Sequence, residues 1–317
     1  MNAKRVLLAL LLTATALPAV AQDAFPAKPI RIVVPFAAGS SSDDNSRFYA
    51  ELMQKALKQP VLVENRPGNG GEIGAVYVKN QPADGYTLLL ASNSIMSLNP
   101  VLKKNLPYDA YADFRPIHGM QVGGAVLVVP VDGPAKTVAD LLKIAKTENR
   151  PLSIGNYSEG YQLLATWLGH SGKVPVTHVP YKGGNPMMLD VVGGRLDAAF
   201  IDAAGVLQMV NSGKVRALAI TDGKRDAKFA DLPTMKEAGF PDFESYVWTS
   251  FYVHSKTPDA VTQKLADTMR DALNTPESKA RVAARPGREL NLHTKAMSDF
   301  QRTESDRFKK VIQAAGL

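Results

Sequence analysis

The stretch RIVVPFAAGSSSDD, residues 31–44, decides the fold class of this chain. Its first four residues contain three consecutive β-branched side chains, which is typical of a buried strand. Pro35 lacks the N–H that a sheet ladder needs, so the strand is predicted to end there. A turn of small residues follows, and a helix with apolar residues at helical spacing is predicted to open with Asp43 and Asp44. A strand that turns tightly into a helix is the building unit of an α/β fold.

The turn from Phe36 to Asp43 is also a candidate binding site. The start of a helix leaves backbone N–H groups unpaired and carries partial positive charge from the helix dipole. Such a start can hold an anion. We therefore hypothesise that this turn receives a carboxylate of a small molecule. The alternative is a turn with a purely structural role.

Strand–loop–helix units repeat along the rest of the chain, and their strands are predicted at 60–65, 86–91, 126–130, 152–155, 176–179, 198–201 and 215–220. This repetition predicts parallel strands joined by crossover helices. The segment from 100 to 116 is predicted to be irregular, and the segment after 257 to be helical.

Two series of these units predict an α/β fold with two lobes. We expect lobe 1 to comprise residues 22–122 and 250–317, and lobe 2 to comprise residues 123–249. The chain is expected to cross between the lobes near 119–125 and 246–253. Lobes whose strand ends face each other form a central cleft, the usual place for a small ligand.

The N-terminus predicts export. Residues 1–21 contain the basic pair Lys4 and Arg5, a short apolar core and an A-x-A cleavage site, so we expect a signal peptide cut between Ala21 and Gln22. The protein would then be periplasmic. No later stretch is apolar for long enough to suggest a membrane span.

Composition excludes several classes of site. The 317 residues are 45% hydrophobic and 21% charged, and they include no cysteine, which excludes disulfides, thiolate catalysis and cysteine-bound metals. The formal net charge of +7 comes from scattered lysines and arginines, so no nucleic-acid partner is expected. The five histidines lack metal-ligand spacing, and no G-x-S-x-G motif is present. We therefore expect no metal, no cofactor and no catalytic residues.

Six motifs in order resemble one protein family: PIRIVVPF (29–36), VENRPGNGG (63–71), DGYTLL (84–89), LPYD (106–109), HVPYKG (178–183) and GGRLD (193–197). The chain resembles, from about Phe25 to its C-terminus, the extracytoplasmic substrate-binding receptors of tripartite tricarboxylate transporters, also called Bug-type receptors.

The resemblance implies a two-lobed type II periplasmic binding protein fold with a central ligand cleft. It implies a carboxylate ligand, which is a di- or tricarboxylate, an aromatic acid or an amino acid, held largely by backbone N–H groups. It also implies integral-membrane transporter subunits as partners, and we expect a monomer. A receptor for a membrane sensor kinase is the alternative that the sequence leaves open, with an exported hydrolase as a remote third.

The two ligand-binding loops of the family correspond here to 36–43 and 156–160. Together with strand ends that face the predicted cleft, they give the candidate ligand-binding residues Phe36, Ala37, Ala38, Gly39, Ser40, Ser41, Ser42, Asp43, Ser92, Asn93, Asn156, Tyr157, Ser158, Glu159, Gly160, Tyr181, Lys182, Gly183 and Asp202.

Both loops depart from the family pattern. The first is serine-rich instead of proline- and glycine-rich, and the second has Tyr157 and Glu159 but no histidine. A carboxylate in an anion cleft repels the expected ligand unless it meets a cation. Glu159 and Asp202 therefore either point to solvent or pair with a ligand amine. Lys182 either meets a distal carboxylate or lies on the surface.

Overall fold

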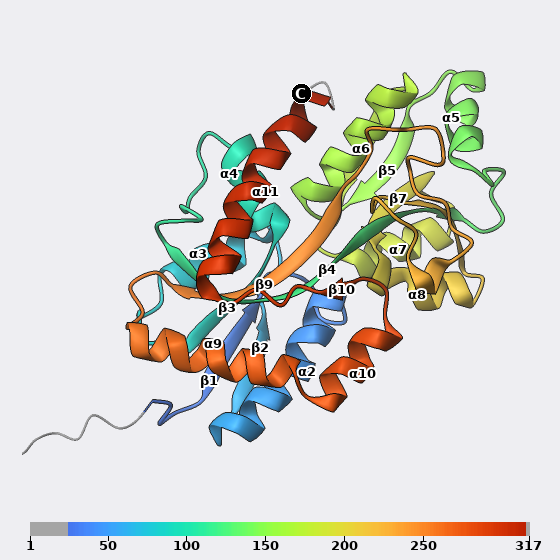
Figure 1. The fold of residues 1–317 in the computed structure, drawn as a ribbon. Helices are drawn as coiled ribbons and strands as arrows, with labels where there is room; N and C mark the ends of the chain where they lie inside the picture. The colour runs from blue at the N-terminus through green and yellow to red at the C-terminus, as the bar shows by residue number, and fades with distance from the viewer. Residues whose placement is uncertain (1–24, 315–317) are drawn as a thin grey trace, which may run out of the picture.

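The computed structural model describes residues 25–314, so the predicted signal peptide lies outside the described part of the chain. Figure 1 shows two groups of helices and strands joined by long strands that run diagonally between them. We call these groups lobe 1 and lobe 2. The predicted lobe boundaries stay a prediction, although the division into two packed groups follows from the contacts given below.

Lobe 1 is built on the stretch 31–44. Strand β1 (Ile30–Val34) lies between two parallel neighbours, β2 (Val61–Asn65) and β3 (Thr87–Ser92). The crossover helices are α2 (Ser41–Leu57) and α3 (Glu72–Lys79). Helix α2 begins two residues earlier than predicted, because the Ser40 side chain caps it by accepting the N–H of Asp43 at 3.2 Å.

Short helical segments and the C-terminal helices complete this side of the molecule. The helical segments are η1 (Asn69–Gly71), η2 (Ser94–Leu98), α4 (Asn99–Leu102), α9 (Asp259–Leu273), α10 (Pro276–Ala284) and α11 (Thr294–Ala314). The two-residue strand β10 (Arg288–Glu289) lies between α10 and α11. Helices α9 and α10 begin beside Pro258 and Pro276, residues that favour the first turn of a helix.

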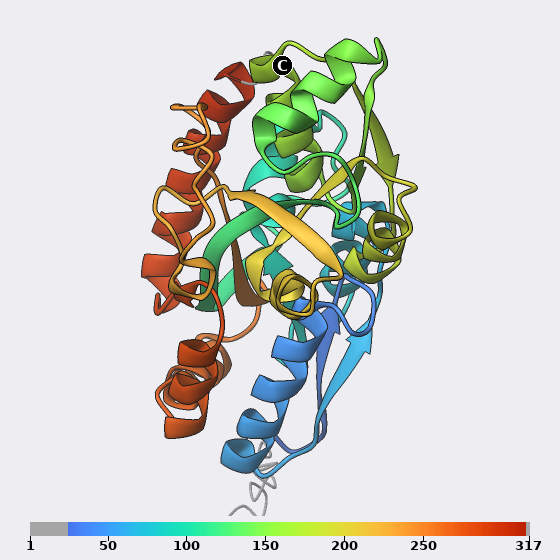
Figure 2. The same ribbon diagram turned by 90° about the vertical axis from the view of Figure 1, so that its right-hand side faces the viewer.

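Lobe 2 has the same alternation of strands and helices. Its elements are α5 (Val138–Thr147), β5 (Leu152–Asn156), α6 (Glu159–Gly172), β6 (Val176–Pro180), α7 (Gly184–Val192), β7 (Ala198–Asp202), α8 (Ala203–Asn211), β8 (Val215–Ile220) and η3 (Ala227–Phe229). Strands β5, β6 and β7 are parallel. In Figure 2 these green-to-yellow elements lie mostly above the blue elements of lobe 1.

Two long strands connect the lobes. Strands β4 (Phe114–Pro130) and β9 (Tyr246–His254) pair in antiparallel fashion, and β4 then continues beyond Gly124 to pair with β7 and β8. The described strands thereby form one sheet, in the order β2-β1-β3-β9-β4-β7-β5-β6, with β8 and β10 also paired to β4. The sequence predicted only 126–130 of β4, because glycines and polar residues interrupt the apolar pattern of its first half.

Each lobe has its own hydrophobic core. One cluster of buried side chains gathers around β1, β3 and β9, and two more lie on the two faces of the sheet of lobe 2. Helix α11 contributes to both sides, since Met297 packs in the first cluster whereas Phe308 and Val311 pack in a cluster of lobe 2. Among residues 25–314, no helix combines the length and the apolar character needed to cross a bilayer.

Candidate ligand-binding site

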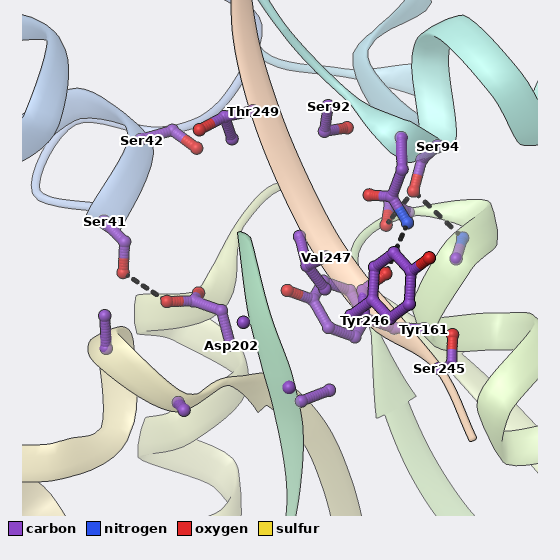
Figure 3. A pocket seen from close by; sticks show the side chains of 18 of the residues that line it. Ser41, Ser42, Ser92, Ser94, Tyr161, Asp202, Ser245, Tyr246, Val247 and Thr249 are labelled. Carbon is purple, nitrogen blue, oxygen red and sulfur yellow. Dashed lines mark hydrogen bonds between the residues drawn. The ribbon is translucent and has the colours of Figure 1, made fainter. Parts of the chain in front are cut away.

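A small cavity lies where the two lobes and the crossing strands meet. Its volume is about 70 Å³, enough for several water molecules. Figure 3 shows polar side chains from both lobes around it. It is lined by Phe36, Ser41, Ser42, Asn45, Ser92, Asn93, Ser94, Gln121, Gly123, Gly124, Ala125, Tyr157, Ser158, Gly160, Tyr161, Leu164, Asp202, Ala203, Ala204, Thr221, Ser245, Tyr246, Val247, Thr249, Pro286 and Phe308.

The start of helix α2 forms one wall, but its amides are only partly free. Asp43 turns back and accepts the N–H of Gly39 at 2.9 Å, and the N–H of Ser40 donates to Ala37 O at 3.2 Å. The N–H of Asp43 is bonded to the Ser40 hydroxyl, so this amide is also occupied by the loop itself. The residues of this loop that line the cavity are Phe36, Ser41 and Ser42.

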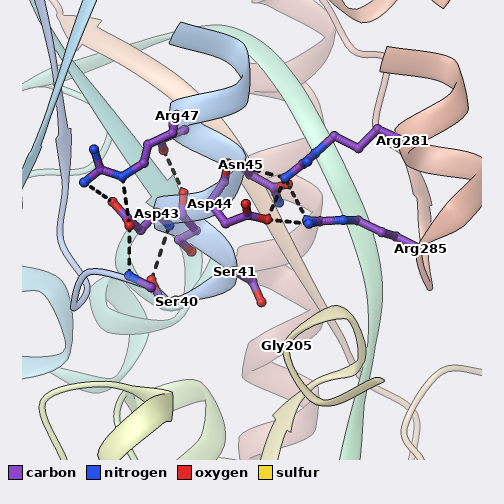
Figure 4. Close-up of polar contacts among 12 residues, drawn as sticks. Ser40, Ser41, Asp43, Asp44, Asn45, Arg47, Gly205, Arg281 and Arg285 are labelled. Atoms are coloured by element: carbon purple, nitrogen blue, oxygen red, sulfur yellow. Dashed lines mark hydrogen bonds and ion pairs between the residues drawn. The ribbon is translucent and has the colours of Figure 1, made fainter. Parts of the chain in front are cut away.

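The two acids at this helix start are balanced by arginines, as Figure 4 shows. Burial opposes ionisation of Asp43, but hydrogen bonds from Arg47, Gly39 and Asn65 outweigh it and hold its pKa below the usual value. Asp44 pairs with Arg281 at 2.6 Å and with Arg285. Each of these acids therefore has a cation of its own.

Asp202 faces this wall from lobe 2. It caps helix α8, accepting the N–H of Gly205 at 2.7 Å through Oδ1. The Ser41 hydroxyl donates to the same oxygen at 2.7 Å and so joins the two lobes directly. Among residues 25–314, the one hydrogen bond to Oδ2 comes from the Tyr157 hydroxyl, at 3.3 Å.

Tyr157 and Tyr161 stand beside this acid. Their rings lie 4.6 Å apart between centroids, and burial raises the pKa of both phenols, with the charge of Asp202 adding to the rise. Both hydroxyls therefore stay protonated and serve as donors at any physiological pH.

The far end of the cavity is made of neutral donors. The Ser94 hydroxyl accepts the N–H of Gly160 at 3.2 Å and lies 3.2 Å from the Ser158 hydroxyl, which brings the two lobes together a second time. Ser92 is 4% exposed, and its hydroxyl has no hydrogen-bond partner among the described residues. A buried hydroxyl without a partner is costly, so Ser92 indicates a position for a ligand or water oxygen.

Glu159 adopts neither of the two arrangements that the sequence suggested. It pairs with Lys103 of lobe 1, and Lys103 also pairs with Glu72. The side chains of Glu72, Lys103 and Glu159 are 8%, 29% and 16% exposed. Burial opposes the charge of Lys103, but its bonds to the two acids outweigh that effect and raise its pKa. We call these three residues the interlobe triad.

Other predicted residues lie outside the cavity. Lys182 is exposed, and the hydroxyl of Tyr181 donates to Asp190 at 2.6 Å. Gly183 packs against Ala37, where an added Cβ would lie 2.9 Å from the alanine Cβ. The residues outside the lining are Ala37, Ala38, Gly39, Ser40, Asp43, Asn156, Glu159, Tyr181, Lys182 and Gly183. The ligand-binding role of every candidate stays a prediction.

Sequence reasoning missed the wall formed by the crossing strands. Asn45 donates to Gln121 at 3.1 Å, and Gln121 donates to the carbonyl of Pro286 at 2.9 Å. Thr249 and Tyr246 on β9 also line the cavity. The positions of Gln121, Tyr246 and Thr249 within the predicted crossings could have identified them as cavity residues, because a segment that joins two lobes must pass the cleft.

The charge of the lining is unusual for an anion site. Among the described lining residues there is one acid, Asp202, and no lysine, arginine or histidine. An anionic ligand would therefore be held by hydroxyl, amide and backbone donors, with the partial charge of helix starts in support.

A family model and several known proteins match this chain. The family model described as "Tripartite tricarboxylate transporter family receptor" matches residues 46–317. A UPF0065 protein of Agrobacterium vitis is 35% identical over 316 residues, which cover 98% of this chain and 91% of that protein.

Solved structures match along nearly the whole chain. The periplasmic binding protein BugD is 31% identical with a TM-score of 0.87, and the match covers 92% of this chain and 99% of that one. A protein of R. palustris with adipate is 28% identical, with a TM-score of 0.87 and coverage of 92% and 98%. MatC from Rhodopseudomonas palustris with bound malate is 26% identical, with a TM-score of 0.85 and coverage of 91% and 100%.

These matches show the α/β fold of periplasmic binding proteins. The family model covers most of the chain, and the relatives match both of its lobes. This chain therefore belongs to the receptor family of the tripartite tricarboxylate transporters.

Proposed function

We propose that this chain is a periplasmic receptor that captures a small organic carboxylate between its lobes and delivers it to the membrane subunits of a tripartite tricarboxylate-type transporter. In this proposal the chain is exported, cleaved between Ala21 and Gln22, and works as a monomer. It makes and breaks no covalent bond.

One observation carries the proposal: among the described residues, the cavity between the lobes is lined by neutral hydroxyl and amide donors and by no lysine, arginine or histidine. The unpartnered hydroxyl of Ser92 and the hydroxyls of Ser42 and Ser94 supply hydrogen bonds to a carboxylate without the desolvation cost of a buried cation. Adipate and malate, the acids in two solved relatives, belong to the same chemical class.

Closure over the ligand supplies the signal for delivery. The hydrogen bonds Ser41–Asp202 and Ser94–Ser158 join the two lobes and form when the lobes are together. A ligand that contacts both lobes adds further contacts to this closed form, which the open form lacks. A ligand that binds the closed form more tightly shifts the population toward it. The closed surface is then what the membrane subunits recognise.

A thermal-shift assay against a panel of organic acids tests the proposal. A ligand at 100 times its dissociation constant stabilises the fold by about 2.7 kcal/mol, which raises the melting temperature measurably. Neutral sugars of similar size serve as the control and are expected to leave it unchanged. A sugar that raises the melting temperature while no organic acid does so would contradict the proposal.

A further inference from the structure

The cavity contains an acid whose charge has no partner. Asp43, Asp44 and Glu159 each pair with a base, whereas the described contacts of Asp202 come from a serine hydroxyl, a tyrosine hydroxyl and a backbone N–H. These donors orient the carboxylate but leave its negative charge uncompensated. The described lining residues include no lysine, arginine or histidine that would neutralise it.

Asp202 also keeps the capacity to accept a further hydrogen bond. A carboxylate offers about four lone-pair positions. Oδ1 takes two short bonds, from Ser41 and Gly205, and Oδ2 takes one long bond of 3.3 Å from Tyr157. The second oxygen is therefore the position from which Asp202 would contact a ligand.

The two ends of the cavity differ in the chemistry that they accept. Figure 3 shows Ser41 and Asp202 on one side of the crossing strands and Ser94 on the other. The serine end offers neutral donors, which suit a carboxylate. The Asp202 end repels a second carboxylate and attracts a positively charged donor.

Resting on the proposed function, we infer that Asp202 selects, among small carboxylates, those that also carry a protonated amine. The carboxylate of such a ligand lies among the serine hydroxyls, and its ammonium group donates to Asp202 Oδ2. The acid is held in place from both lobes, so it acts as a specificity-determining residue of the closed form.

Isothermal titration of the purified mature protein with matched pairs of acids tests this inference. The pairs are L-aspartate with succinate, L-glutamate with glutarate, and β-alanine with propionate, whose members differ by one amino group. Within at least one pair, the amino acid is expected to bind at least tenfold more tightly, roughly one charge-assisted hydrogen bond. Malate is included because it replaces the amino group of aspartate by a hydroxyl.

Two variants assign the preference to this residue. Asp202→Asn keeps the shape of the side chain and removes its charge, so the preference for the amino acid is expected to fall by at least tenfold. Asp231→Asn is the control, because it removes the same charge from an exposed position of lobe 2 outside the cavity. Circular dichroism confirms that both variants fold.

The outcomes separate this inference from the proposed function. If the plain acid binds as tightly as the amino acid in every pair that binds to wild type, or malate binds as tightly as aspartate, the inference is wrong and the receptor function stands. A preference that Asp202→Asn leaves unchanged also overturns the inference. If no acid of either kind binds, both the proposed function and the inference fail.

Discussion

The interlobe triad provides the sharpest test of how the lobes are held together. Lys103 in lobe 1 lies between Glu72 of its own lobe and Glu159 of lobe 2. The substitution Lys103→Met keeps much of the length and apolar surface of the side chain and removes the charge. It leaves two carboxylates facing each other across the lobe boundary.

The expected cost follows from burial. An isolated pair of unit charges about 4 Å apart interacts with roughly 4 kcal/mol at an effective dielectric constant of about 20. Because Lys103 is 29% exposed, solvent screens part of this interaction, and we expect the closed form to lose about 2 kcal/mol. That loss corresponds to a ligand affinity lower by up to about 30-fold.

Titration calorimetry with the tightest acid of the panel measures the affinity, and small-angle X-ray scattering measures the closure. Lys104→Met is the matched control, since Lys104 is the exposed neighbour of the triad. Adding Glu159→Gln to Lys103→Met removes one of the two facing charges and is expected to restore part of the affinity. An unchanged dissociation constant and an unchanged radius of gyration for Lys103→Met would refute this reasoning.

Two further predictions concern stability. His118 is fully buried, and burial lowers its pKa, so its neutral form stabilises the fold above the unfolded-state pKa of about 6.5. Stability is therefore expected to fall as the pH drops from about 7.5 through 6.5 toward the lower folded-state pKa of His118. The decline is expected to be shallower in His118→Gln. A wild-type melting temperature that is the same at the high and the low end of this pH range would contradict the prediction. Asp197 accepts two bonds from Arg150 and two from Ser153. Asp197→Ala is expected to cost about 2 kcal/mol and lower the melting temperature by roughly 3 °C in calorimetry, whereas an unchanged value would show that the cluster adds nothing.

The fold was largely predictable because its signals are local. The apolar run of β1, the caps of α5 and α10 and the span of α3 all follow from residues within one turn of each element. The first half of β4 was not predictable, since its strand conformation depends on pairing with β9, more than a hundred residues away. Periodicity carries no information about such a partner.

The site was predictable only in part, for a similar reason. Ser41, Ser42 and Asp202 follow strand ends, and the fold class places strand ends at the cleft. The partner of Glu159 was not readable, because Lys103 belongs to a segment without regular spacing. The sequence also did not reveal that Asp43 accepts a hydrogen bond from the N–H of Gly39. Residue spacing carries no information about this bond.

The way lobe 1 is assembled has a consequence for biogenesis. Its core needs Trp248, Phe251 and Met269, which leave the ribosome long after β1 and β3. At about 5–20 residues per second, the roughly 125 residues between Val122 and Trp248 take on the order of ten seconds to synthesise. The first lobe thus stays unfinished until translation is nearly over. A nascent chain that folds late remains unfolded for longer, and an unfolded chain is the form that can pass through a secretion pore.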